Sequence, residues 1–351
     1  MWLLYTLRAE LYEFTGPEAV PGGYAILSHV WEKVPKGNNE QSFKELQALR
    51  EQCELTGENP RDHAHPKIRR FCECAELWGH QWAWADMCCI DKSSSSELSE
   101  AINSMFRYYS VADVCYVYLA DVPTEDWLQD PYSDGSDPAY VRYSKFGQSE
   151  WHKRGWTLQE LIAPPTVIFL SQDWVSLGAK ADLAQVLSLC TGIPEGLFTS
   201  SQRPSHFSIA QRMSWAAQRV TTRHEDEAYC LMGIFDVQMP TLYGEGRRAF
   251  RRLQEEIMRK SADPSLFAWG LRYPLTQASE VLSSSVCSWD DNFTAFLFAN
   301  WPTDFAHSQE VSFERPQHFD DDKVLLFLNC AFVNIPKHDH TVGSPWGRHW
   351  C

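Results

Sequence analysis

Three apolar segments in the first third of the chain most constrain its fold. They are YAILSHVW (24–31), WAWADMCCID (82–91) and VCYVYLADV (114–122). Short apolar runs bounded by turn residues are typical of strands buried on both faces of a sheet. Helical patterns lie between them, and a strand, a helix and a strand in this order form a right-handed crossover. The sequence therefore predicts an α/β fold with a mostly parallel sheet.

The segments between these strands repeat with the helical period. A serine run at 93–96 precedes apolar residues that share one helix face: Leu98, Ala101, Ile102, Met105, Phe106 and Tyr109. Two further helices are predicted at 42–53 and 66–77, and residues 2–14 are predicted to form a short β-hairpin.

The predicted organisation has three parts. Residues 1–175 form the α/β core, which includes a long acidic loop at 123–150. Residues 176–262 carry helical patterns and form a helical extension of this core. In residues 263–351, strand-like segments such as FTAFLFAN and KVLLFLNCAFVNI are separated by polar linkers, which predicts a mainly β region.

The segment WHKRGWTLQEL (151–161) is the predicted centre of the chemistry. On a helix, Trp156 and Glu160 lie four residues apart on one face, so the indole would limit the water around the carboxylate. A carboxylate beside an aromatic wall and an arginine is a common arrangement for a reactive acid. The prolines at 164–165 end this helix, and TVIFL (166–170) reads as a buried strand. On spacing alone, an amphipathic helix with one exposed glutamate explains the pattern equally simply.

Polar and aromatic residues follow the first two predicted strands: Ser28, His29 and Trp31 after the first, and Asp86, Cys89, Asp91 and Lys92 after the second. Parallel sheets bind ligands at the carboxyl ends of their strands. We therefore expect Ser28, His29, Trp31 and Asp86 to line one crevice with Glu160, and the other three residues to lie at its edge. Arg154, or its neighbour Lys153, is available there for a phosphate group. A loop histidine with satisfied hydrogen bonds is an equal alternative for His29.

Charge and segment length exclude several classes of function. The formal net charge of −15 and the isoelectric point near 5.2 argue against a nucleic-acid binder, which needs a basic face. No segment approaches the roughly 18 apolar residues that span a bilayer, and the apolar start of the chain is too short for a signal peptide. We therefore expect no membrane association.

The cysteines indicate a reducing compartment. Their number, 11, is odd, and they lack the regular spacing of a secreted disulfide scaffold, so we expect free thiols and a cytoplasmic location. His63, His65, Cys72 and Cys74 are residues of the types that bind zinc. Their spacing matches no closed zinc pattern, and Cys72 and Cys74 would point to different faces of one helix. We expect no metal site.

Several of these segments resemble the fungal heterokaryon-incompatibility (HET) domain. They include YAILSHVW, WAWADMCCID, the helix and strand that follow, RGWTLQELIAP, and the later stretch from SWAAQRV to RRLQEEIM, all in order within about residues 1–270. HET domains are more remotely similar to the Toll/interleukin-1 receptor (TIR) fold. The resemblance implies a flavodoxin-like sheet with helices on both faces, and a part in self/non-self recognition or regulated cell death.

The resemblance also implies a reaction. RGWTLQEL is similar to the TIR pattern of Trp, three residues and Glu, and in TIR enzymes that glutamate is needed to cleave the nicotinamide–ribose bond of NAD. Glu160 inherits this role by position, with Trp156 beside it, NAD as substrate and no cofactor. One alternative is a non-enzymatic module that self-associates into a homo-oligomer. Another is a HET scaffold adapted to other small-molecule chemistry.

Overall fold

The computed structural model describes residues 1–34, 37–38, 40–125, 144–269 and 298–312. Their core is a seven-stranded sheet in the order β2-β1-β6-β3-β7-β8-β9. The four inner strands run parallel: β6 (Trp82–Trp84), β3 (Ala25–His29), β7 (Val114–Tyr118) and β8 (Val167–Leu170). Antiparallel strands complete both edges: β1 (Trp2–Tyr5) with β2 (Glu10–Glu13), and β9 (Ser176–Ala179). The predicted α/β fold with a mostly parallel sheet is confirmed.

The order of the inner strands determines where a ligand can bind. After β3 the chain places β6 on one side, and it then returns across the sheet to place β7 on the other side. The connections therefore reverse direction at the gap between β3 and β7. Such a switch point, at the carboxyl ends of the strands, is where open α/β sheets bind their ligands.

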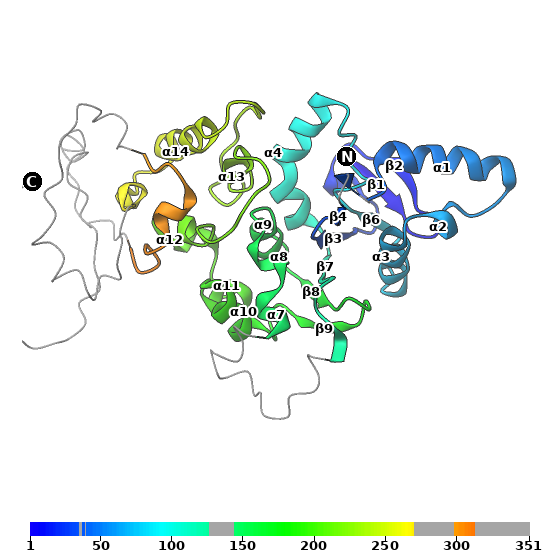
Figure 1. The fold of residues 1–351 in the computed structure, drawn as a ribbon, viewed down its shortest axis with the longest axis horizontal. Helices are drawn as coiled ribbons and strands as arrows, with labels where there is room; N and C mark the ends of the chain where they lie inside the picture. Colours follow the sequence, from blue (N-terminus) through cyan, green and yellow to red (C-terminus); the bar gives the residue numbers. More distant parts are fainter. Residues whose placement is uncertain (35–36, 39, 126–143, 270–297, 313–351) are drawn as a thin grey trace, which may run out of the picture.

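Helices cover both faces of the sheet. Right-handed crossovers that leave in opposite directions place their helices on opposite faces. Accordingly, α1 (Phe43–Thr56), α2 (Pro60–His63) and α3 (Pro66–Leu77) lie on one side, and α4 (Ser95–Val111) and α9 (Thr157–Ile162) lie on the other (Figure 1). The inner strands β6, β3, β7 and β8 are therefore largely buried on both faces, as their apolar runs predict.

Local chemistry explains where the helices between the first strands begin and end. The Ser42 hydroxyl accepts the Glu45 N–H, and the Glu45 carboxylate accepts the Ser42 N–H, which closes a capping box at the start of α1. At the other end Gly57 has a φ of 75°, a left-handed conformation that favours glycine and ends the helix. At the start of α4, the Ser94 hydroxyl accepts the Glu97 N–H.

The second strand is shorter than the sequence predicts. We expected strand from 82 to 91, but β6 ends at Trp84. The carbonyl of Ala85 accepts N–H groups from both Cys88 and Cys89, so the chain turns there instead of pairing with a neighbour. Asp86 still follows the carboxyl end of the strand.

Most of the helices after the sheet are short. They are α10 (Ala184–Thr191), α11 (Glu195–Phe198), α12 (Ile209–Ser214), α13 (Asp226–Tyr229) and α14 (Arg248–Lys260). After α12 and α13 the backbone continues in tight turns, in which Ala217 and Leu231 each donate to a carbonyl three residues earlier.

The remaining described elements are small: η1 (Pro17–Ala19), β4 (Lys33–Val34), β5 (Gly37–Asn38), α7 (Lys145–Gln148), α8 (Glu150–Lys153), η2 (Pro204–His206), η3 (Pro264–Phe267) and η6 (Pro302–Phe305). Most of the predicted acidic loop at 123–150 and of the predicted β region at 263–351 lies outside the described residues. The division of the chain at residues 175 and 262 stays a prediction, although β9 shows that the sheet itself continues past residue 175. Within the described ranges, no helix is long and apolar enough to cross a bilayer.

Candidate functional site

Glu160 lies on α9 and is hydrogen bonded to the carboxyl end of β3. Its Oε2 accepts a hydrogen bond from the Oγ of Ser28, which is fully buried. The same Oγ accepts a hydrogen bond of 2.7 Å from the indole Nε1 of Trp151, which lies on α8 and is also fully buried. An indole, a hydroxyl and a carboxylate are thus connected in series at the switch point of the sheet.

The acidity of Glu160 is unusual for a carboxyl group. Burial raises its pKa to about 8, and the negative charge of Asp86 acts in the same direction. The hydrogen bond from Ser28 and the charges of Arg154 and Arg219 oppose this shift without cancelling it. Perturbed carboxyl groups of this kind cluster at functional sites, because burial that disfavours the charged form is costly to maintain for stability alone.

Residues from beyond the sheet hold the start of α9. Arg219 donates from Nη1 to the carbonyl of Arg154 and to the hydroxyl of Thr157, both at 2.9 Å. Val220 continues this contact, because its N–H donates to the carbonyl of Lys153 and its carbonyl accepts the N–H of Gly155. The loop that leads into Glu160 is therefore bonded to the helical part of the chain.

A buried lysine holds the end of the same helix. Lys180 follows β9 and donates from Nζ to the carbonyls of Leu161 at 3.2 Å and Pro164 at 2.5 Å. Cations near a helix C-terminus satisfy its last carbonyl groups. Because α9 has only six residues, it depends on such contacts more than on its own hydrogen bonds.

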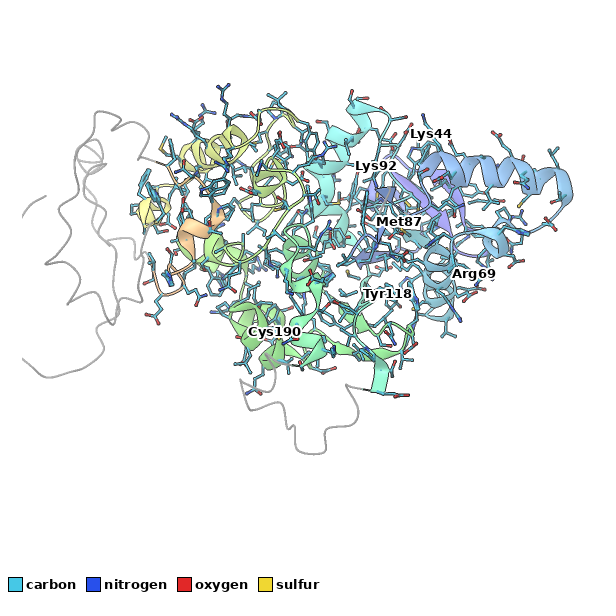
Figure 2. The ribbon with its side chains drawn as sticks, in the orientation of Figure 1. Lys44, Arg69, Met87, Lys92, Tyr118 and Cys190 are labelled. Carbon is cyan, nitrogen blue, oxygen red and sulfur yellow. The ribbon has the colours of Figure 1, made fainter. Side chains whose placement is uncertain are left out.

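His29 directs its side chain to the opposite face of the sheet from Ser28, as consecutive strand residues do. Its Nε2 lies 3.1 Å from Oδ1 of Asp86, and Trp31 donates from Nε1 to the other oxygen of that carboxylate at 2.9 Å. Lys92, labelled in Figure 2 just before α4, lies with its Nζ 3.6 Å from the centre of the Trp31 ring. These four predicted residues are therefore connected to one another.

Asp86 is the charged counterpart of Glu160. Burial acts to raise its pKa, but the hydrogen bond and charge of His29, together with Lys92 and Trp31, outweigh burial and hold the pKa at about 2. Asp86 is thus ionised at neutral pH, whereas Glu160 titrates near neutrality. Two carboxyl groups whose charges interact and whose pKa values are separated can take different roles in one reaction.

Behind His29 lies a buried charge cluster of His29, Glu40 and Lys67. The ammonium of Lys67 lies 2.5 Å from Oε1 of Glu40 and 3.3 Å from Nδ1 of His29. The imidazole of His29 therefore has partners at both ring nitrogens, Asp86 at Nε2 and Lys67 together with the Val30 carbonyl at Nδ1. The alternative of a satisfied histidine thus describes His29 as well as the ligand-binding hypothesis does.

Three of the predicted residues have other partners. The indole of Trp156 interacts with the carboxyl group of Asp226 on α13, and Trp151, not Trp156, is the tryptophan that is hydrogen bonded to Ser28. Cys89 is buried, and its sulfur accepts the N–H of Ala85. Asp91 accepts the N–H and hydroxyl of Ser93 and so shapes the turn before α4.

A cavity of about 340 Å³ lies away from this site. It is lined by Trp2, Glu13, Trp84 and Glu97 among others, and Cys89 is the one predicted site residue in its wall. Glu160 and Ser28 do not line it. The carboxylate site and this cavity are therefore separate features of the described fold.

A family model described as heterokaryon incompatibility protein (HET) matches residues 24–160, from the residue before β3 to Glu160. The vegetative incompatibility protein HET-E-1 of Podospora anserina is 44% identical over 255 residues, which cover 71% of this chain and 17% of that protein. The chain is a HET-domain protein. It spans only 17% of the length of this curated relative.

A second family model, a domain of unknown function (DUF8212), matches residues 248–341, beginning with α14. No solved structure matches the chain. The HET match contains the whole hydrogen-bonded series of Trp151, Ser28 and Glu160, and it also contains Asp86. Lys180 and Arg219, which hold the two ends of α9, lie beyond the HET match.

Proposed function

We propose that this HET-domain protein acts in fungal self/non-self recognition and regulated cell death, and that it cleaves the nicotinamide–ribose bond of NAD. The relative named as a vegetative incompatibility protein supports the first part. One observation carries the second part: a carboxyl group with its pKa raised to about 8 is bonded to Ser28 at the switch point of the sheet. We place the reaction in the cytoplasm, with NAD as substrate and no bound cofactor.

The chemistry needs one well-placed anion. Breaking a glycosidic bond passes through an oxocarbenium-like transition state, and most glycosidases use two carboxyl groups for it. The nicotinamide ring of NAD is already cationic, so it leaves as a neutral molecule and needs no general acid. The carboxylate of Glu160 would stabilise the positive charge on the ribose, and water would then add to the anomeric carbon with loss of a proton.

The direct test is nicotinamide release from NAD by the full chain, at concentrations high enough for self-association. Glu160→Gln keeps the shape of the side chain and removes its charge, so we expect release to fall at least about 100-fold, or about 2.7 kcal/mol. Glu150→Gln changes an exposed glutamate of α8 and serves as the matched control. Release that is equal in wild type and Glu160→Gln, or absent from both folded proteins, would exclude the proposed reaction for this chain.

Two substitutions should move the pH dependence in opposite directions. The rate for free enzyme should rise with pH through the pKa of Glu160 near 8, because the ionised form is required. Ser28→Ala removes a hydrogen bond that lowers this pKa, whereas Asp86→Asn removes a charge that raises it. We expect the midpoint of kcat/KM to move up by about 0.5–1 pH unit in the first variant and down by a similar amount in the second. Midpoints that move together would show that another group controls the profile.

A non-enzymatic signalling module is the second candidate. The observation that favours it is that Glu160 already has Ser28 as a partner, while the 340 Å³ cavity lies elsewhere. In that case the carboxylate would hold α9 against β3, and self-association would carry the signal. Concentration-dependent assembly that is the same in wild type and Glu160→Gln, without nicotinamide release, would support this role.

A further inference from the structure

Cys53, Glu58 and His63 bring a thiol, a carboxylate and an imidazole to one point, far from Glu160 in the sequence. One ligand atom from each residue lies within 4.8 Å of the others. Cys53 belongs to the last turn of α1, Glu58 to the connection, and His63 is the last residue of α2. Figure 1 shows this connection at the outer end of the α1–α2 layer, on the opposite side of the sheet from α9.

The backbone holds these three residues in place. Gly57, with its φ of 75°, reverses the chain after α1 so that Glu58 turns back toward Cys53. Asn59 caps α2 and also donates from Nδ2 to the carbonyl of Leu7 at 3.0 Å. Arg61 donates to the carbonyl of Thr6 at 3.1 Å. The connection is therefore tied to the turn between β1 and β2 as well as to its own helices.

The donor spacing is close to that of a metal site. His63 Nε2 and Glu58 Oε2 lie 3.2 Å apart. Zinc bonds of about 2.0–2.3 Å in a tetrahedron place neighbouring donors about 3.3–3.7 Å apart. The sulfur of Cys53, within 4.8 Å of both, needs a shift of roughly 1 Å or less to reach the same geometry.

The surroundings favour a cation. Cys53 is 2% exposed, while Glu58 and His63 have side chains that are 55% and 48% exposed, so the point is open on one side. The carboxylates of Glu58 and, more weakly, of Asp62 act on the sulfur of Cys53, and the guanidinium of Arg8 acts against them. The local field is thus negative, and a divalent ion would be held in place of the thiol proton.

We propose that Cys53, Glu58 and His63 form a zinc site with three protein ligands and a fourth position open to water. Sulfur, oxygen and nitrogen donors together suit Zn²⁺ among the common divalent ions. Binding releases the thiol proton of Cys53 and changes no oxidation state. The ion cross-links the end of α1 to the end of α2.

This set differs from the combination that the sequence suggested. Only His63 is shared. The Nδ1 of His65 accepts the N–H of Lys67 at the start of α3, and Cys72 is fully buried. Cys53 and Glu58 lie before the histidines at a spacing that follows no zinc pattern, so only the folded connection brings the three together.

Cobalt provides the test, because a Co²⁺–thiolate bond gives a charge-transfer absorption band that oxygen and nitrogen ligands alone do not give. The reduced full chain should show this band on titration with Co²⁺, and Zn²⁺ should displace it. Cys53→Ser should remove the band, and His63→Ala should weaken Co²⁺ binding at least about 10-fold. Cys74→Ser is the matched control, since Cys74 is a partly exposed thiol on α3 that should leave the band unchanged.

A second measurement separates binding from misfolding. Zn²⁺ should raise the Tm of wild type and of Cys74→Ser, but not that of Cys53→Ser, because only a folded site binds the ion. A charge-transfer band absent from wild type, or one that persists in Cys53→Ser, would overturn the proposed site.

Discussion

Lys67→Met is expected to lower the free energy of unfolding by about 3–5 kcal/mol at neutral pH. The side chain of Lys67 is 3% exposed and that of its partner Glu40 is 1% exposed. Methionine keeps most of the volume of the lysine and removes the ammonium that neutralises this carboxylate. A buried charge without its counter-charge costs far more than an exposed one, so the loss should far exceed that of a surface ion pair.

Urea unfolding of three variants checks this expectation. Lys44→Met changes an exposed lysine of α1 (Figure 2) and should alter stability by less than about 0.5 kcal/mol. The double variant Lys67→Met, Glu40→Gln removes both charges, so it should be more stable than Lys67→Met alone. A loss below about 1 kcal/mol for Lys67→Met would mean that water reaches Glu40 and that the cluster is not a buried ion pair.

Glu160→Gln should be more stable than wild type, and the difference in the free energy of unfolding should grow as the pH rises. The pKa of Glu160 is raised from 4.5 to about 8 in the folded chain, so folding favours the protonated form. The stability from this group is fully present below about pH 4.5 and is lost as the pH rises through about 8. Glutamine has no charge to bury, so its advantage over wild type should grow by about 3 kcal/mol between pH 5.5 and 8.5.

Chemical unfolding at these two pH values measures the difference. Glu150→Gln should follow wild type at both values, because the Glu150 side chain is 61% exposed and its carboxylate stays in water when the chain folds. An advantage of Glu160→Gln that is constant with pH would place the pKa of Glu160 near its ordinary value. Such a result would remove the main electrostatic reason for giving Glu160 a role in the reaction.

Apolar runs and helical periods were sufficient to predict the centre of the sheet. The strands at β3, β7 and β8 and the hairpin of β1 and β2 follow from local patterns, because each is short and bounded by turn residues. Strand β9 was missed, since SLGA carries little apolar signal and pairs only at an edge. The end of β6 at Trp84 was also missed, because it depends on which carbonyl the N–H groups of Cys88 and Cys89 reach.

The sequence predicted several residues of the site, but few of the contacts between them. The proximity of Ser28 to Glu160 follows from the rule for strand ends, and the structure brings them into contact. Trp151 stands at the head of the same motif, but the sequence does not say which of two tryptophans turns inward. Lys67, Lys180 and Arg219 lie 38, 16 and 62 residues along the chain from His29, Pro164 and Thr157, which they contact. No local pattern pairs residues at these separations, so only the tertiary fold reveals the contacts.

The residues that support α9 extend beyond the part of the chain that matches the HET family. The HET match ends at Glu160, yet Lys180 and Arg219 hold the two ends of the helix that carries this residue. A fragment cut where the match ends would contain the whole hydrogen-bonded series and lose the support that orients it. The segment that matches the HET family is therefore not a structurally independent unit. The residues that follow it in the chain can influence how rigidly the Glu160 carboxylate is held.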